Sequence, residues 1–371
     1  MTPLDIDADA DLDVTEKPGS VGSDMEEPHL GYFPRIVAGA PAGRPLYVTT
    51  QGAVVGKSGE RILVSFKDEC LASVRMEDTS QVCVYGGVSL SSALIGALLD
   101  HGIPILHFSQ TGWFKGITSG LASSNIILRQ AQFERLKLGD LDAACVTVSS
   151  KIKNSRTLLR RNARADVGTA LSSLASASSA ARLADSSESL LGIEGAAARV
   201  YFSHFALLLA QSSARHFQFM ERNRRPPRDP INSLLSYLYG ILTKDMIVAS
   251  SSVGLDPYLG FYHRPRHGSP ALALDLIEEL RPILADSVAM SLINRREVSV
   301  DDFVVTPTGV SISHAAKKAV IHAYERRLEQ TVKHPVVGYE ITYRRLFEIQ
   351  ARIFAAYLMG EVCSYVPFEV R

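Results

Sequence analysis

The sequence predicts an α+β protein of two domains, in which a small β-rich, β-sandwich-like N-terminal domain precedes a larger all-α C-terminal domain. A chain of 371 residues is longer than one hydrophobic core usually supports, so two domains are expected. Short valine-rich runs fill residues 44–123, and helical periodicity then dominates to the end of the chain. The predicted domains are therefore residues 44–123 and 124–371.

Residues 1–43 differ in composition from both domains and predict an acidic, disordered leader. The first 29 residues hold nine acids and one base, Lys17. So polar a segment cannot bury enough apolar surface to order itself. The whole chain has 39 basic and 39 acidic residues, so leaving out these charges gives 38 against 30, a net charge of +8. The body of the protein is therefore expected to be basic.

The N-terminal domain is predicted to form an antiparallel sheet, because its apolar runs are short and separated by glycine or charged turns. These runs are LYVTT, GAVVGK, RILVSF, ASVRM and QVCVYG. The segment 89–103 has the pattern of one helix, with Ser89 as its cap and Gly102 as its end. Residues 104–117 return to strand.

The C-terminal domain is predicted from seven segments with helical periodicity. They are residues 125–139, 146–165, 170–211, 230–254, 269–294, 311–332 and 342–360. The third segment is rich in small residues in its first half and is broken by the glycines at 192 and 195.

Composition and motifs exclude several classes of protein. No apolar run reaches the roughly 18 to 20 residues of a membrane span, and no signal peptide is visible, so a cytoplasmic protein without a membrane segment is expected. The four cysteines are scattered and lack metal-ligand spacing, which favours reduced thiols over a disulfide framework. The chain also has no P-loop, no GxSxG elbow and no GxGxxG after a strand.

The stretch GFYHRPRHGSPALALDLIEELRP, residues 260–282, is the first candidate for a site. It places His263 on a stiff turn and then Asp275 and Glu278 three residues apart on a predicted helix, where they share one face. Two like charges this close repel each other unless a cation, a base or water separates them. A metal site and a solvated helix start are both compatible with this stretch alone. The nearby His267 is expected at the surface.

A second acid, Glu194, stands between two glycines in LLGIEGAAARVYF. An acid flanked by glycines suits a ligand or a catalytic carboxylate, whereas the alternative is a capping glutamate in a first helical turn. A glutamate, a histidine and a further acid together can hold a hard, oxygen-preferring ion such as Mg²⁺ or Mn²⁺. Zinc is a poorer match, because no cysteine accompanies these residues and no HExxH helix is present.

Two basic clusters complete the candidate chemistry. The residues expected to contact DNA are Lys151, Lys153, Asn154, Arg160 and Arg161 in KIKNSRTLLRR, and Arg222, Arg224 and Arg225 in MERNRRPPRDP. Such clusters on a basic body are typical of proteins that bind a phosphate backbone, although a charge run is also compatible with a solvated helix face. Neither cluster has a base-reading signature, so binding through backbone and shape is expected.

Four segments in this order resemble the CRISPR adaptation integrase family, the first of the numbered CRISPR-associated proteins. They are LLGIEGAAARVYF, NRRPPRDPINSLLSYLYGIL, LDPYLGFYHRPRHGSPALALDLIEELRP and FVVTPTGVSISHAAKKAVIHAYERRL. The basic helix KIKNSRTLLRR and the opening strands are also similar to that family, and the resemblance covers roughly residues 45–370.

The resemblance implies a homodimer whose helical domain is catalytic and transfers a DNA 3′-hydroxyl onto a phosphodiester of the CRISPR repeat array with a bound Mg²⁺ or Mn²⁺. The family's metal ligands and catalytic residues match Glu194, His263 and Glu278, and Asp275 would make an outer or water-mediated contact. The implied partners are double-stranded DNA, as prespacer and repeat array, and a small ferredoxin-like protein. Some members are fused to a RecB-like nuclease with an iron–sulfur cluster, but no cysteine precedes Cys70 here.

Two other functions remain open from the sequence. The same ligands would serve a metal-dependent DNA nuclease that hydrolyses phosphodiesters with water. A non-catalytic DNA-binding scaffold with a structural acid cluster is the third interpretation.

Overall fold

The computed structural model describes residues 43–112, 114–120, 125–138, 140–223, 226–264, 266–307 and 309–370. Every described residue belongs to one compact unit, Phe33–Arg371. All but one residue of the predicted leader lie outside the described residues, so its disorder stays a prediction.

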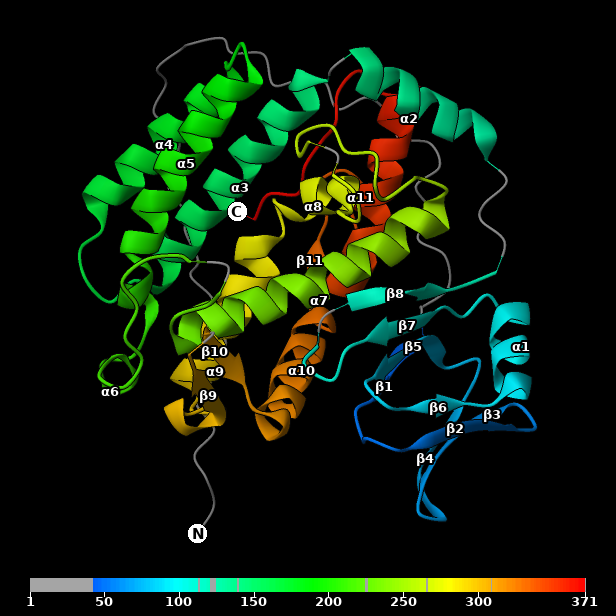
Figure 1. Cartoon of the computed structure of the whole chain (residues 1–371). Coiled ribbons are helices and arrows are strands. Elements are labelled where there is room, and N and C mark those ends of the chain that lie inside the picture. Colours follow the sequence, from blue (N-terminus) through cyan, green and yellow to red (C-terminus); the bar gives the residue numbers. More distant parts are fainter. Residues whose placement is uncertain are drawn as a thin grey trace. The chain divides into compact units, whose positions relative to one another are not determined.

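The N-terminal part is β-rich, as predicted, and forms two four-stranded sheets (Figure 1). One sheet has the order β1-β5-β7-β8 and the other β4-β3-β2-β6. Its elements are β1 (Arg44–Val48), β2 (Val54–Ser58), β3 (Arg61–Phe66), β4 (Glu69–Arg75), β5 (Thr79–Tyr85), β6 (Ser89–Leu90), α1 (Ser92–Asp100), β7 (Ile105–Phe108) and β8 (Phe114–Thr118). Val55 and Ile62 of one sheet share a buried cluster with Val82 and Ile105 of the other.

The antiparallel prediction is wrong for part of these sheets. Strand β5 pairs in parallel with β1 and β7, and β6 pairs in parallel with β2. The connections explain this, because α1 carries the chain from β5 back to the start of β7, and such a crossover leaves the two strands parallel. Ser91 rather than Ser89 caps α1, since Ser89 pairs with Val54 in the sheet.

The C-terminal part is mostly helical, as predicted. Its helices are α2 (Ile126–Leu138), α3 (Leu141–Asn162), α4 (Gly168–Arg182), α5 (Ser187–Ser203), η1 (Phe205–Leu208), α6 (Gln211–Ala214), α7 (Pro230–Val253), α8 (Ala271–Ile277), η2 (Arg281–Asp286), α9 (Ser287–Asn294), η3 (Val300–Asp302), α10 (His314–Leu328) and α11 (Tyr343–Leu358). None of the helices in the described ranges is long and apolar enough to cross a membrane.

Two short hairpins interrupt this helical region. They pair β9 (Phe303–Thr306) with β10 (Gly309–Ile312), and β11 (Thr331–Lys333) with β12 (Glu340–Thr342). The first follows from the β-branched run at 304–306 and a turn that needs Gly309, whose φ is +130°. A Cβ at Gly309 would also lie 2.8 Å from Pro226 and Pro227.

The predicted helix 269–294 is divided into three pieces. It begins as α8, continues after a turn as the π-helical η2, and ends as α9. Pro282 lies in η2 and has no amide hydrogen to donate to the preceding turn, so the α-helical ladder cannot continue through it. Local π-helix is frequent at functional sites.

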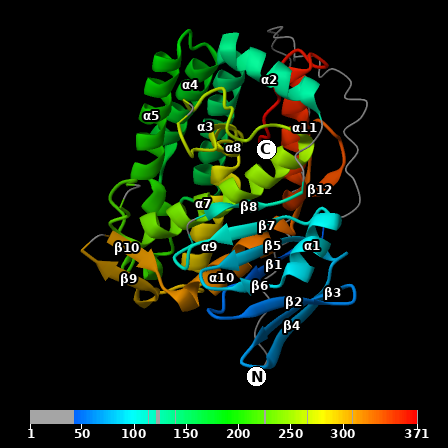
Figure 2. The same cartoon turned by 45° about the vertical axis from the view of Figure 1, so that its right-hand side comes forward.

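The long helices α3 and α7 organise the C-terminal core. Helix α3 packs against α4 and α5, and α7 packs against α8 and α11 (Figure 2). The core extends into the β-rich part, because Cys83, Tyr85 and Leu106 belong to the same buried cluster as the helices. The hydroxyl of Tyr47 in β1 donates to Glu325 of α10 at 2.8 Å.

Candidate active site

A single buried carboxylate, Asp275 of α8, shapes the turn that carries His263. Its Oδ2 accepts from the backbone amides of Phe261 at 2.7 Å and Tyr262 at 3.0 Å, and its Oδ1 accepts from the amide of His263 at 2.8 Å. A Cβ at Gly260 would lie 2.6 Å from Asp275 Oδ2 and 2.7 Å from the carbonyl carbon of Ala271. Only glycine therefore lets the turn lie this close to α8.

The same carboxylate orients the ring of His263. Nδ1 lies 2.5 Å from Asp275 Oδ1, and Nε2 lies 3.7 Å from Glu278 Oε1. A histidine that donates Nδ1–H to a carboxylate presents the lone pair of Nε2, which is how metal-binding histidines are commonly held. Burial raises the pKa of Asp275, although its bonds to His263 act in the opposite direction.

Glu194 reaches the same place from α5. Its Oε1 contacts the ammonium of Lys151 of α3, and its Oε2 accepts from the hydroxyl of Tyr262. The capping interpretation of Glu194 is wrong, because Glu194 lies in the middle of α5 and Ser186 is the cap. A Cβ at Gly192 or Gly195 would meet nothing within 4 Å, so the helix surface beside Glu194 is open.

Lys151 joins the two acids. Its Nζ lies 2.6 Å from Oε2 of Glu278, in an ion pair rather than a well-directed hydrogen bond. Arg281 binds the other oxygen of Glu278 at 2.9 Å. The Lys151 and Glu194 side chains are each 14% exposed and that of Glu278 is 1% exposed, so water screens these charges poorly.

The neighbouring positive charges lower the pKa values of both Glu278 and Glu194. Burial works against ionisation of Glu278, but the positive charges of Arg281 and Lys151 outweigh it and lower its pKa to about 2. Burial likewise opposes ionisation of Glu194, and Lys151 lowers its pKa overall. Both glutamates are therefore anionic at neutral pH.

The arrangement is suited to a cation. Among the described residues, no three His, Cys, Asp or Glu side chains form a ready-made metal-binding group. The cation at the centre is instead the Lys151 ammonium, on which Glu194 and Glu278 converge. Two carboxylates with one imidazole are also donors that Mg²⁺ or Mn²⁺ accepts.

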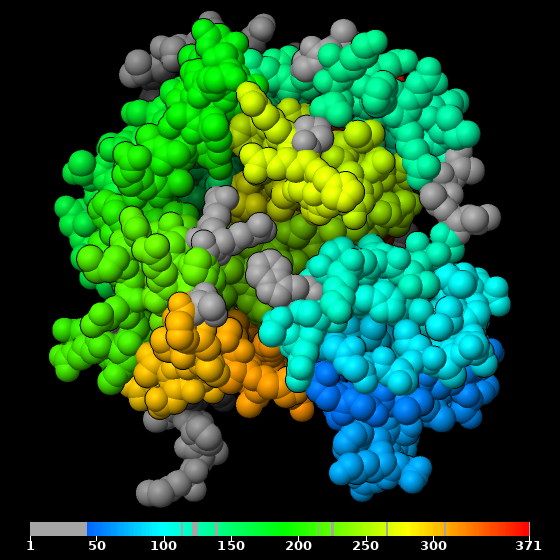
Figure 3. All heavy atoms as spheres, viewed as in Figure 1, coloured from blue at the N-terminus to red at the C-terminus, as the bar shows by residue number. Residues whose placement is uncertain are grey.

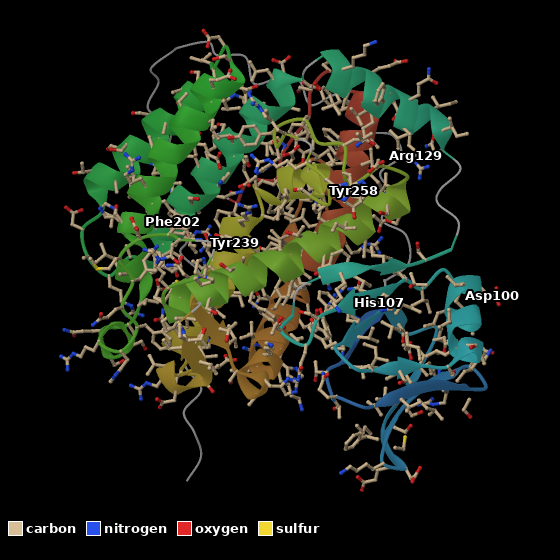
Figure 4. All side chains as sticks on the ribbon, viewed as in Figure 1. Asp100, His107, Arg129, Phe202, Tyr239 and Tyr258 are labelled. Atoms are coloured by element: carbon tan, nitrogen blue, oxygen red, sulfur yellow. The ribbon has the colours of Figure 1, made fainter. Side chains whose placement is uncertain are left out.

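A small cavity of about 40 Å³ adjoins this cluster. Lys151, Glu194 and Arg281 line it, and so do Phe202 and Tyr239, which lie close together in Figure 4. The guanidinium of Arg281 lies 4.9 Å from the Tyr239 ring centre. Such a space holds one or two waters or a single ion. In Figure 3 the yellow surface of the His263 turn lies beside the green surface of α4 and α5.

Arg222 belongs to the wall of this cavity rather than to an outer surface. Arg222 lines the cavity, and its guanidinium lies 5.3 Å from the ring centre of Tyr239. It also donates to Asn232 Oδ1 at 2.7 Å. Tyr239 thus holds two arginines next to Lys151, and its hydroxyl donates to Asp286 at 2.7 Å. Three positive side chains therefore border the cavity.

The remaining predicted DNA contacts divide into three groups. Arg160 and Arg161 are exposed, and Lys153 is partly exposed and binds Glu369 at 3.0 Å. Arg224 and Arg225 lie outside the described residues. The prediction for Asn154 needs correction, because this side chain is 1% exposed and donates to the carbonyls of Glu279 and Phe368 at 2.9 and 2.8 Å.

Sequence reasoning missed three contributors to the site. Tyr262 precedes His263, so its place on the same turn was a usable signal. Arg281 follows Glu278 by three residues, the spacing at which helical side chains meet. The sequence predicts Lys151 as a DNA contact, and no sequence signal distinguishes it from Lys153. In the structure Lys151 pairs with Glu278, whereas Lys153 pairs with Glu369.

Comparison with known proteins matches this sequence to one family. A family model described as CRISPR associated protein Cas1 matches residues 46–326. A Cas4/Cas1 fusion from Geobacter sulfurreducens, named as an exonuclease and endonuclease, is 42% identical over 354 residues, which cover 92% of this chain and 63% of that protein. The chain thus spans less than two thirds of this relative. The CRISPR-associated endonuclease Cas1 2 of Rhodospirillum rubrum is 37% identical over 337 residues, 87% of this chain and 97% of the relative.

Solved structures share the fold. A Cas1 protein from Thermotoga maritima superposes with a TM-score of 0.74 at 22% identity, covering 88% of this chain and 100% of that one. A chain of a Cas6-RT-Cas1–Cas2 complex gives a TM-score of 0.72 at 26% identity, covering 89% of this chain and 36% of that one. The β-rich part followed by the helical part is therefore an arrangement with precedents.

Proposed function

The chain belongs to the CRISPR-associated protein Cas1 family, and from this premise we propose that it joins the 3′-hydroxyl ends of prespacer DNA to the CRISPR repeat array by transesterification. The approach of Glu194 and Glu278 to one ammonium, together with His263 Nε2 at 3.7 Å from Glu278, supports the proposal. The neighbouring cavity, bordered by Lys151, Arg222 and Arg281, supports it, because phosphoryl transfer needs positive charge around the reacting phosphate.

Three residues would hold the metal that the family implies. Glu194 and Glu278 would each offer a carboxylate oxygen, and His263 would offer Nε2. A bound Mg²⁺ or Mn²⁺ would polarise the phosphoryl oxygen and favour ionisation of the attacking hydroxyl. Both glutamates are anionic at neutral pH, which is the state that binds a cation.

The remaining side chains have positioning and electrostatic roles in this proposal. Asp275 fixes the orientation of His263, and Tyr262 fixes one oxygen of Glu194. Arg222 and Arg281, both held by Tyr239, would neutralise charge that develops on the phosphate oxygens. The exposed Arg160 and Arg161 would bind the DNA backbone, and that binding would weaken with salt.

The partners are proposed on the names of relatives. One solved neighbour is a complex that contains Cas2, and one relative is a Cas4 fusion. We propose that this chain acts as a homodimer with a small Cas2-type protein of ferredoxin-like fold, and that a Cas4-type, RecB-like nuclease supplies or trims its DNA ends.

A second candidate reaction is hydrolysis of DNA by the same residues, which the endonuclease names of the relatives favour. Labelled prespacer and supercoiled repeat DNA separate the two reactions. We expect Mn²⁺-dependent joined products from the wild type, whereas cleaved products alone would support the nuclease. Products that persist in excess chelator would contradict both, and a scaffold would give no product while still binding DNA.

The His263→Ala variant tests the site itself. Joining should be lost while most DNA binding remains, because the basic surface is unchanged. His267→Ala is the matched control, since His267 is exposed on the same turn. Full joining activity in His263→Ala would remove the site from consideration.

A further inference from the structure

A larger cavity of about 350 Å³ lies beside the C-terminal half of α3. Its walls come from α3, η2, α9, α10 and the first residue of α11, and Figures 1 and 2 show α9 beside α10. Pro282 lines both this cavity and the small one at the candidate active site. Lys151 and Ser155 of α3 line the small cavity, whereas Thr157 and Arg161 line the larger one.

The wall of this cavity is strongly positive. Four arginines line it, namely Arg161, Arg295, Arg326 and Arg327, and none of the described residues that line it is acidic. Arg326 binds both oxygens of Glu297, at 2.7 and 2.8 Å. Within the described ranges, neither Arg295 nor Arg327 has a carboxylate at ion-pair distance.

Arg327 is held in place by neutral groups. Its guanidinium lies 4.5 Å from the ring centre of Tyr343, and it donates to the carbonyl of Ile283 at 3.3 Å and to Gln330 Oε1 at 2.5 Å. Burial lowers the pKa of Arg327, Tyr343 acts in the opposite direction, and the positive charge of Arg161 lowers it again. The fold therefore keeps like charges together in a half-buried space, at a cost in free energy that a bound anion would offset.

The rest of the wall indicates what kind of anion fits. A volume of about 350 Å³ is larger than a phosphate ion requires and lies near the lower end of the range for small-molecule sites. The lining also includes the apolar side chains Leu158, Ile283, Val288, Met290 and Ala323, and uncharged polar side chains such as Asn162, Ser287 and Ser291. An arginine guanidinium binds two phosphate oxygens through two parallel hydrogen bonds, and an apolar surface accommodates a sugar or a base.

We propose that this arginine-lined cavity binds a phosphorylated nucleoside, either a free nucleotide or the terminal nucleotide of a DNA strand. Arg295 and Arg327 would bind the phosphate, and the apolar wall beside Ile283 and Val288 would contact the nucleoside. The choice of a nucleotide over other phosphorylated molecules rests on the proposed function, whereas the anion site rests only on the charges and the cavity.

Calorimetric titration of the full chain in EDTA tests this proposal. The probes are deoxyadenosine 5′-monophosphate, deoxyadenosine, inorganic phosphate, and a short single strand with and without a 5′-phosphate. We expect the monophosphate to bind more tightly than deoxyadenosine or phosphate, and its affinity to fall about tenfold in Arg295→Gln and in Arg327→Gln. Tighter binding of the phosphorylated strand would identify a strand end as the source, and tighter binding of the free monophosphate would identify a nucleotide.

Controls keep the outcome clear. Arg352→Gln should bind like the wild type, because Arg352 binds Glu348 on α11 and does not line the cavity. Arg295 is exposed, so its variant should fold even where Arg327→Gln does not. Binding that neither variant weakens, or phosphate binding as tight as nucleotide binding, would overturn the proposal. His263→Ala should bind the probes normally, so failure of this cavity and failure of the proposed reaction give different results.

Discussion

The ammonium of Lys151 lies 2.6 Å from Oε2 of Glu278, a carboxylate that is almost wholly buried. The same ammonium contacts Glu194 on a different helix. Burial disfavours the charged ammonium, yet Glu278 and Glu194 outweigh this effect and raise the pKa of Lys151. A positive charge therefore already balances the two acids that are expected to hold a metal.

Replacing Lys151 with methionine should make the stability of the fold depend more strongly on a bound divalent cation. Without the ammonium, Glu194 and Glu278 repel each other in a buried setting, so the free energy of unfolding in EDTA should fall by about 3 to 5 kcal/mol. Added Mn²⁺ should restore part of it and bind more tightly than to the wild type, as measured by denaturant unfolding and by electron paramagnetic resonance. Lys153→Met is the control, because Lys153 lies on the same helix as Lys151 and binds the partly exposed Glu369. Equal Mn²⁺ affinity in Lys151→Met and wild type would contradict this.

The Asp275→Asn variant should impair joining without preventing DNA binding. Asp275 accepts backbone N–H groups through both of its carboxylate oxygens, whereas an asparagine side chain has only one accepting oxygen. The turn would therefore lose part of its support, and the His263 ring would lose its fixed orientation. Loss of such an orienting carboxylate typically costs about 10- to 100-fold in activity or metal affinity. Joining and Mn²⁺ binding should fall together in this variant. Asp256→Asn, in the same turn but away from His263, should leave both unchanged.

Asp286 should make stability depend on pH between about 4 and 6. Burial raises its pKa from 3.8 to about 6, against the effect of hydrogen bonds from Tyr239 and Tyr201. In this window the folded state binds more protons than the unfolded state, so stability falls as pH rises and levels off above pH 6. The wild type should lose up to about 3 kcal/mol relative to Asp286→Asn across the window. Parallel stability curves for the two proteins would refute this assignment.

Asn154 and Arg160 should behave as opposites, although both lie in the basic segment of α3. Asn154→Ala leaves the carbonyls of Glu279 and Phe368 and the amide of Val370 without their buried partner, and should destabilise the fold by about 2 to 4 kcal/mol. DNA affinity per folded molecule should not change.

Arg160→Gln should instead leave stability within about 0.5 kcal/mol of the wild type. It should weaken DNA binding at low salt and reduce the salt dependence by about one phosphate contact. Thermal unfolding and fluorescence anisotropy measured over a salt series distinguish these two variants. Weaker DNA binding in folded Asn154→Ala would reverse the assignment.

The sequence by itself determined the fold class and part of the site. Strand and helix periods identify which side chains of an element turn inward, and this local information sufficed for the β-rich part and the helices that follow. His263, Asp275 and Glu278 lie within 16 residues of one another, so a turn and the helix after it already bring them together. The expected surface position of His267 is also confirmed, because that side chain is exposed.

Only the tertiary structure decided which distant residues meet. Strand order and parallel pairing depend on how the crossovers pack, and the break of the helix at 278–286 places Arg281 and Asp286 at a cavity. Lys151 and Glu194 come from α3 and α5, and Glu278 follows directly after α8, so their contact depends on how these three helices pack within the core. The polar side of α3 likewise holds Asn154 inside and Arg160 outside, because neighbouring elements cover the one and leave the other in water. Local sequence pattern sets the chemistry of each helix face, whereas the free energy of burying those faces together sets their neighbours.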